Sequence, residues 1–106
     1  MASTPEGKVK AAVRKVLDAY NVWYFMPVSG GYGKQGIHDF IVCSNGRFLS
    51  IECKDEGKRP TRLQDQCAQD IQAAKGITLL IEGVQQVDIV TMYLEMMGAT
   101  QRETTT

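Results

Sequence analysis

The sequence predicts a single small α/β domain in which helices flank a mixed β-sheet. The main observations are apolar residues at helical spacing near both ends of the chain and a hairpin signal in its middle. The expected order of elements is α-β-β-β-α-β-α. The 106 residues suffice for one domain. We place it at residues 1–98 and expect the polar segment 99–106 to be a disordered tail.

The first part of the chain predicts a helix, a strand and a loop. Ser3, Thr4 and Pro5 indicate the start of the helix, with Pro5 in its first turn, and the helix should end near Tyr20. The run 21–28 is rich in aromatic and β-branched residues, which is typical of a strand. The run 29–36 contains four glycines and predicts a loop.

A hairpin is predicted in the middle of the chain. An Asn-Gly dipeptide at 45–46 separates two β-rich runs, 38–44 and 47–54. A two-residue turn fixes the register and places Asp39 opposite Glu52. Directly opposed residues share a face, with Cβ atoms about 4.5–5.5 Å apart. A bulge or a three-residue loop would break this register.

A helix is expected after the hairpin. Thr61 can cap its start, with Gln64 in the capping-box position. The helix should run to about Lys75 and end at Gly76.

A strand and a last helix follow. The apolar run 77–82 is typical of a strand in a sheet that is covered on both faces. Apolar residues at helical spacing predict the last helix over about 85–97, and a strand over 87–92 is the competing interpretation.

The polar residues at the end of the hairpin suggest chemistry. Lys54 lies two residues beyond Glu52 and therefore projects on the face that Glu52 shares with Asp39. Two opposed carboxylates repel, and a divalent cation can offset that repulsion with the lysine. Mg²⁺ prefers oxygen ligands, and the backbone carbonyl of Cys53 could supply another. Such an ion activates water for phosphodiester hydrolysis, while a lysine orients or deprotonates it. Surface salt bridges are the alternative explanation.

The motifs at these positions resemble a known family. The runs GIHDF (36–40), IECK (51–54) and TRLQ (61–64) are similar in order and spacing to the virus-type replication-repair nuclease domain, VRR-NUC, of the PD-(D/E)xK nuclease superfamily. The resemblance covers nearly the whole chain, from Glu6 to about Met97. It implies a restriction-endonuclease-like core, a divalent ion that is usually Mg²⁺ or Mn²⁺, and cleavage of DNA.

The resemblance also implies roles for particular residues. Asp39 and Glu52 match the metal-binding acids, and Lys54 matches the catalytic lysine. Gln64 matches a glutamine in the helix after the motif. Glu6 matches a glutamate of the first helix that completes the acidic site.

Some of these positions have simpler explanations. Glu6 and Gln64 could serve only as capping-box residues at the starts of their helices. The superfamily often has proline before the aspartate, whereas His38 stands there in this chain. His38 could contact phosphate or water, but a substituted residue at the start of a strand is the simpler interpretation.

The distribution of charge bears on nucleic-acid binding. The formal net charge is zero, which counts mildly against a nucleic-acid binder. A basic cluster after the hairpin and a glycine-rich loop before it could nevertheless contact phosphate or a base. The alternative is a pair of solvated loops. The candidate DNA-binding residues are Tyr32, Lys34, Lys58, Arg59 and Arg62.

Cysteine usage and hydropathy indicate where in the cell the protein is expected. Cys43, Cys53 and Cys67 form no CxxC pair and are expected to be reduced thiols. No apolar run approaches the roughly 20 residues that span a bilayer. We therefore expect a cytoplasmic protein of a bacterial or phage-infected cell, with no membrane partner.

Together these features favour a structure-selective DNA endonuclease. Small phage-type members of the family resemble Holliday-junction resolvases that act as homodimers, and Met92, Met96 and Met97 of the last helix could form the dimer surface. A general, flap or nicking nuclease without junction selectivity is the second possibility. The third is a non-catalytic nucleic-acid- or protein-binding module, which predicts no divalent-ion binding. Removing Asp39 should relieve the repulsion between the acids and could raise the stability of the metal-free protein.

Overall fold

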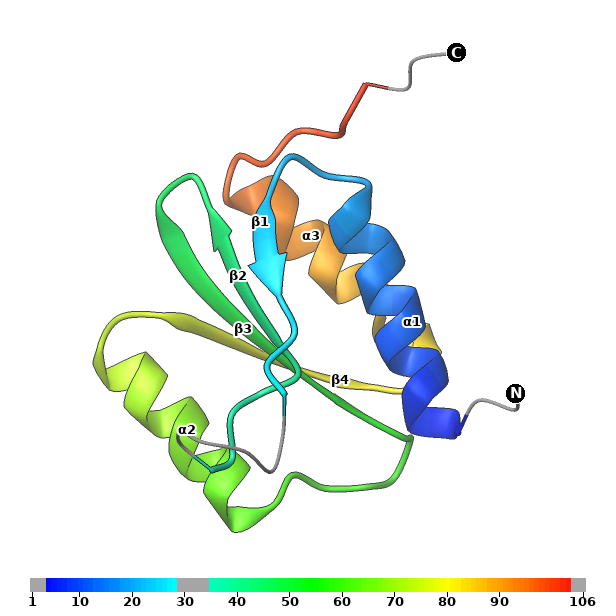
Figure 1. The fold of residues 1–106 in the computed structure, drawn as a ribbon, viewed down its shortest axis with the longest axis vertical. Helices are drawn as coiled ribbons and strands as arrows, with labels where there is room; N and C mark the ends of the chain where they lie inside the picture. Colours follow the sequence, from blue (N-terminus) through cyan, green and yellow to red (C-terminus); the bar gives the residue numbers. More distant parts are fainter. Residues whose placement is uncertain (1–3, 29–34, 104–106) are drawn as a thin grey trace.

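The computed structural model describes residues 4–28 and 35–103. The described residues form a four-stranded sheet with α-helices on it (Figure 1). The predicted order of elements is confirmed, with a short 3-10 helix (Val84–Gln86) added before the last helix. The elements are α1 (Pro5–Asp18), β1 (Trp23–Phe25), β2 (Phe40–Ser44), β3 (Arg47–Lys54), α2 (Arg62–Ala73), β4 (Ile77–Glu82) and α3 (Asp88–Met96).

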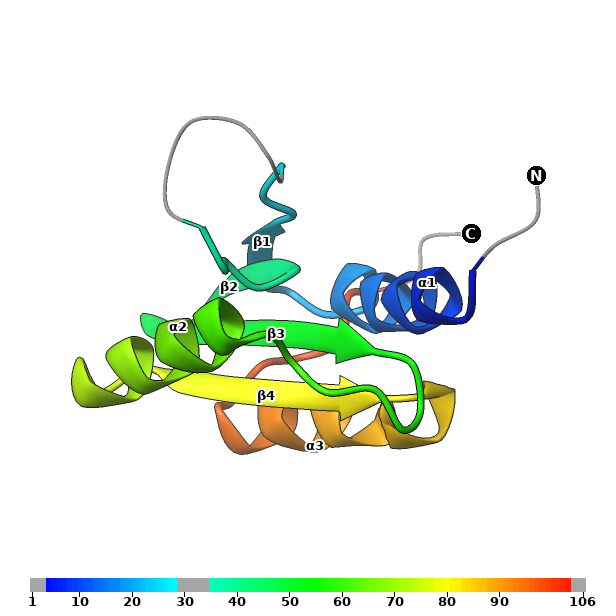
Figure 2. The ribbon, with the colours of Figure 1, turned by 90° about the horizontal axis from the view of Figure 1, so that it is seen from below.

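The sheet is mixed, as predicted. Its strand order is β1-β2-β3-β4; β1, β2 and β3 pair antiparallel, and β4 pairs parallel to β3. A parallel neighbour needs a crossover, and α2 supplies it. Figure 2 shows α2 and α3 on opposite sides of β3 and β4.

The hairpin has the predicted register. Asn45 and Gly46 both have positive φ, 52° and 77°, which a two-residue turn between twisted strands requires. Ser44 therefore pairs with Arg47, and the ladder continues to Phe40 opposite Ile51. Regular pairing of β2 stops there, so the predicted pair of Asp39 opposite Glu52 is not part of the ladder.

One face of this hairpin forms the core. Alternate residues of β2 and β3 point to the same side, where α1 and α3 cover them. The opposite face of β3 carries the polar residues Ser50, Glu52 and Lys54. The fully buried core residues of the two strands are Phe40, Val42, Leu49, Ile51 and Cys53, and those of the two helices are Val9, Val13, Leu17, Val90 and Leu94.

Two element ends differ from prediction. The strand expected over 21–28 is shorter, because only Trp23–Phe25 pairs with β2. At the end of α2 the left-handed residue is Lys75, with φ 74°, and not Gly76. Gly76 is needed for space instead, since a Cβ there would lie 2.6 Å from the side chain of Ile71.

The last helix is confirmed, and the competing strand over 87–92 is wrong. Val87, Val90, Leu94 and Met97 are all buried, as their helical spacing predicts. The α-helix itself begins at Asp88, because the 3-10 turn takes up the residues before it. No helix in the described ranges has both the length and the apolar character needed to cross a membrane.

The expectation of a disordered tail from residue 99 is wrong for its first part. The backbone N–H of Asn21 donates to the carbonyl of Thr100, and the N–H of Arg102 donates to the carbonyl of Ala19, both at 2.8 Å. Gln101 and Tyr20 form an isolated antiparallel β-bridge. Polar composition suggested a free end, but backbone groups left unpaired after α1 bind this segment. Residues 104–106 lie outside the described part.

Gly36 offers a test of how tightly the segment before β2 packs against the first turn of α2. It has a φ of 78°, and a Cβ added there would lie 2.5 Å from the backbone of Leu63. Gly57 has a similar φ of 82° with nothing within 4 Å of the added atom. Urea denaturation should show that Gly57→Ala costs about 1 kcal/mol of unfolding free energy from strain alone. Gly36→Ala should cost about 1–3 kcal/mol more, because overpacking adds to the strain. Equal losses would show that this contact is not tight.

Candidate active site

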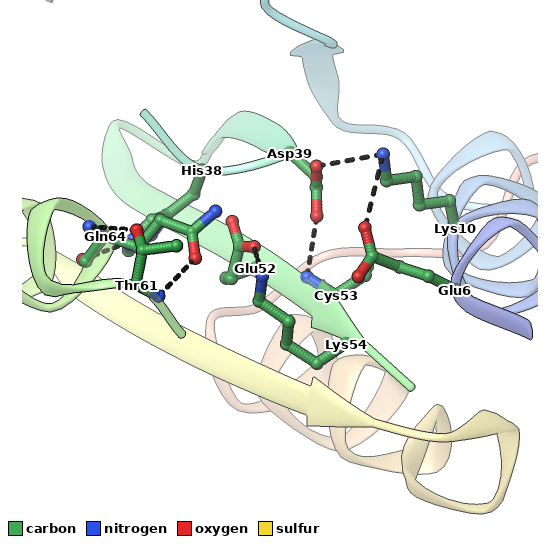
Figure 3. Close-up of polar contacts among 9 residues, drawn as sticks. All are labelled: Glu6, Lys10, His38, Asp39, Glu52, Cys53, Lys54, Thr61 and Gln64. Carbon is green, nitrogen blue, oxygen red and sulfur yellow. Dashed lines mark hydrogen bonds and ion pairs between the residues drawn. The ribbon is translucent and has the colours of Figure 1, made fainter. Parts of the chain in front are cut away.

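The candidate site lies at the end of β3 that is remote from the hairpin turn (Figure 3). Asp39 precedes β2, while Glu52 and Lys54 lie on β3 and face the same side. Lys10 and Glu6 approach from α1, and Gln64 from the first turn of α2. Three segments distant in sequence therefore meet at this edge.

Asp39 is fixed by the end of the β2–β3 ladder. Because pairing stops at Phe40, the N–H of Cys53 has no partner on β2. The Oδ2 atom of Asp39 accepts this hydrogen bond at 2.8 Å. In an antiparallel ladder the N–H and carbonyl of such a residue face the same neighbour, so the Cys53 carbonyl faces the same edge. The Cys53 carbonyl and the Asp39 carboxylate therefore lie on the same edge of β3.

Glu52 is the most constrained acid of the site. It is only 3% exposed, and its Oε2 atom lies 3.6 Å from the ammonium nitrogen of Lys54. Its Oε1 atom is buried and has no hydrogen-bond partner among the described residues. Burial, and then the negative charge of Asp39, raise the pKa of Glu52 to about 7, although Lys54 opposes the shift. A charged Glu52 is therefore under electrostatic stress that a further cation would relieve.

Lys54 is held close to that acid. Its side chain is 12% exposed, so water solvates the ammonium poorly and Glu52 is its neighbouring counter-charge. A lysine so placed can donate hydrogen bonds into the space beside Glu52.

Lys10 is a site residue that the sequence interpretation missed. Its ammonium nitrogen lies 3.3 Å from Oδ1 of Asp39 and 3.9 Å from Oε2 of Glu6. Burial lowers the pKa of Lys10, but the charges of Asp39 and Glu6 outweigh it and leave the pKa raised. The i,i+4 spacing from Glu6 was a signal available in the sequence.

Glu6 reaches the site through Lys10. Thr4 is the N-cap of α1 and accepts from the N–H of Gly7 at 2.9 Å, so Glu6 is not a capping-box acid. Within residues 4–28 and 35–103, no three His, Cys, Asp or Glu side chains lie together as ligands for one metal ion. The implied three-acid set is therefore not assembled among the described residues, and the Lys10 ammonium contacts both Glu6 and Asp39 (Figure 3).

Gln64 has a structural role in this arrangement. Its Oε1 atom accepts from the N–H of Thr61 at 2.8 Å, and the Thr61 hydroxyl accepts from the Gln64 N–H at 3.2 Å. The predicted capping box is thereby confirmed. Gln64 also lines a pocket of about 80 Å³ together with Glu52 and His38. Its side chain is thus near Glu52, and a catalytic role for it stays a prediction.

His38 joins the sheet to α2. It is 3% exposed, with Nδ1 2.8 Å from the Ser50 hydroxyl and Nε2 2.9 Å from the carbonyl of Gln64. A carbonyl only accepts, so Nε2 carries a hydrogen. His38 therefore does more than substitute for proline at the start of a strand, because it ties the first turn of α2 to the sheet beside Glu52.

The predicted DNA-binding residues fall into two groups. Lys58 and Arg59 are exposed in the turn after β3, and Arg62 is exposed at the start of α2. Tyr32 and Lys34 lie outside the described residues. The basic cluster therefore follows directly from the strand end that carries Glu52 and Lys54.

The cysteines form no disulfide. Cys43 is exposed, whereas Cys53 and Cys67 are buried. Burial raises the pKa of the Cys53 thiol well above its ordinary value, and the charges of Asp39 and Glu52 add to this. Cys53 therefore contributes backbone atoms to the site and not a reactive thiolate.

Comparison with known proteins adds no relative. No family model matches the chain, and no curated protein matches it.

Glu52 makes the metal-free protein sensitive to pH. A carboxyl group whose pKa is raised on folding stabilises the fold below its ordinary pKa, and that contribution is lost as pH rises through the higher value. In EDTA, the unfolding free energy should fall as pH rises from 4.5 through about 7. Glu52→Gln should remove about 3 kcal/mol of this dependence, since the pKa rises from 4.5 to about 7 and one pKa unit corresponds to about 1.4 kcal/mol.

Urea denaturation at a series of pH values measures this effect. Glu56→Gln, in the exposed turn after β3, is the matched control and should follow the wild type. If Glu52→Gln shows the same pH dependence as the wild type, burial does not stress this acid.

Proposed function

We propose that this protein is a divalent-metal-dependent endodeoxyribonuclease of the VRR-NUC type, in the PD-(D/E)xK superfamily. The observation that carries the proposal is the buried Oε1 atom of Glu52, near Asp39 and Lys54, which has no hydrogen-bond partner among the described residues. The resemblance to the family supports the proposal, because its motif residues Asp39, Glu52 and Lys54 all lie at the same end of β3.

The donors at this strand end suit Mg²⁺ or Mn²⁺. Asp39 and Glu52 would hold the ion with their carboxylates, and the Cys53 carbonyl faces the same edge. Mg²⁺ usually takes only one or two carboxylates, with water and substrate phosphate completing its shell. A buried carboxylate oxygen without a partner is costly, and a cation would satisfy it. When bound, the ion would activate water and neutralise charge on the phosphoryl group.

Lys54 supplies the remaining chemistry. Its ammonium lies beside Glu52 in a poorly solvated position, where its hydrogen bonds and charge act strongly. In the proposed reaction it orients the attacking water or stabilises the charge that develops on phosphate. Lys58, Arg59 and Arg62 would bind the phosphates of the flanking DNA.

Branched DNA is the substrate that we propose, with the protein acting as a homodimer. Met92 and Met96 are exposed one turn apart on α3, at 51% and 71%, which supports a role in dimer contact. Met97 is buried in the core and would not take part. A dimer would present two sites to two strands, whereas a monomer in solution would favour the general, flap or nicking nuclease.

Cleavage assays with matched variants test the proposed chemistry. Asp39→Asn keeps an acceptor for the Cys53 N–H but removes the charge, and Lys54→Met keeps the aliphatic chain but removes the ammonium. Both should reduce cleavage by at least about 100-fold, as expected for loss of a group that stabilises the transition state. The assay compares a four-way junction with its linear duplex, with Mg²⁺ or Mn²⁺ and with EDTA.

The control for this assay is Lys75→Met, an exposed change after α2. It should cut at the wild-type rate. Cleavage by Asp39→Asn or Lys54→Met near that rate would show that the site is assigned wrongly. A wild-type protein that neither cuts DNA nor binds either ion would support the non-catalytic binding module.

Asp39→Ala should lower stability in the metal-free protein, which reverses the sequence-based expectation. The acid accepts from the Cys53 N–H and pairs with Lys10, so its removal leaves the Cys53 N–H without its acceptor and Lys10 with only Glu6. An unsatisfied buried donor costs about 1–3 kcal/mol. Denaturation in EDTA should therefore rank Asp39→Ala below Asp39→Asn; equal stabilities would contradict this.

A further inference from the structure

Lys10 lies where a ligand of Asp39 would bind. The two oxygens of Asp39 have different partners: Oδ2 accepts from the Cys53 N–H at 2.8 Å, and Oδ1 lies 3.3 Å from the Lys10 ammonium nitrogen. The backbone bond fixes Oδ2, because strand pairing holds Cys53 in place. Oδ1 is therefore the oxygen that Asp39 can offer to another group, and Lys10 already lies against it (Figure 3).

Lys10 and Lys54 pair with different acids of the site. Lys54 lies 3.6 Å from Glu52, while Lys10 lies against Asp39 and, at 3.9 Å, Glu6. Lys54 is on a central strand and is 12% exposed, so it is held in place. The Lys10 side chain is 36% exposed at the margin of the site, and its flexible stem can withdraw into water.

We propose that Lys10 is the resident counter-ion of Asp39, which a divalent ion must displace, so that Lys10 lowers the affinity of the site for metal. This inference rests on the proposed function, because it takes Asp39 and Glu52 as the metal-binding acids. Lys10 also supports the fold without metal, since it offsets the repulsion among Glu6, Asp39 and Glu52. The same ammonium repels an incoming divalent ion.

Calorimetric titration of Mn²⁺ into the metal-free protein tests the inference. Lys10→Met removes the charge and should bind Mn²⁺ about tenfold more tightly, as the repulsion between an ammonium and a divalent ion at contact range predicts. Lys10→Arg keeps the charge and should not bind more tightly than the wild type. Lys8→Met removes an exposed charge from the same helix and should leave the affinity unchanged.

Thermal unfolding provides a readout that does not involve cleavage. In EDTA, Lys10→Met should melt below the wild type, because Asp39 and Glu6 then lose the ammonium that lies beside them. In the same Mn²⁺ concentration it should gain more in melting temperature than the wild type, since tighter binding stabilises the folded state more. Lys10→Gln, which keeps hydrogen-bond donors without charge, should show the same increase in affinity if Lys10→Met does not fold.

The outcomes separate this inference from the proposed function. If the wild type binds Mn²⁺ and the neutral Lys10 variants bind it no more tightly, Lys10 does not compete with metal and only this inference fails. If none of the proteins binds Mn²⁺, the metal site itself is wrong and both proposals fail.

Discussion

The pairing of β2 with β3 decides where each polar group of the site lies. The Asn-Gly turn sets the register, and the ladder then runs to Phe40 opposite Ile51. Its end leaves the Cys53 N–H without a strand partner, and the Asp39 carboxylate takes that place at 2.8 Å. A shift of one residue would move Glu52 to the apolar face and break this contact. The site therefore depends on the same hydrogen bonds that align the core residues.

Charge burial is the second constraint. The site places Glu52 at 3% exposure with one oxygen that has no partner among the described residues, which a protein selected only for stability would avoid. Functional sites are where such strain concentrates. The proposed divalent ion would offset this cost, because it binds the deprotonated carboxylate and would satisfy the oxygen that has no partner. The same environment places Lys54 beside the acid.

The helices contribute unequally to the site. The buried residues of α1 pack into the core, while its first turns carry Glu6 and Lys10 to the strand end. The capping box at Thr61 fixes the first turn of α2, and the contact from His38 to the Gln64 carbonyl holds this turn against the polar face of the sheet. α1 and α2 thus each place one end at the site, whereas α3 contributes only to the core. Small changes in helix position would alter the electrostatics there.

Much of this protein was determined by local sequence. The hairpin register, the capping box and the helical stripe of α3 each depend on residues close in the chain, so spacing alone predicted them. The grouping of Asp39, Glu52 and Lys54 followed from that register. The tertiary structure alone decided the pairing of Lys10 with Asp39, the hydrogen bond of Asp39 to Cys53, and the binding of residues 100–102 beside α1. These contacts join segments that are distant in sequence, and their geometry depends on where strand pairing stops and how α1 packs, which no local pattern encodes.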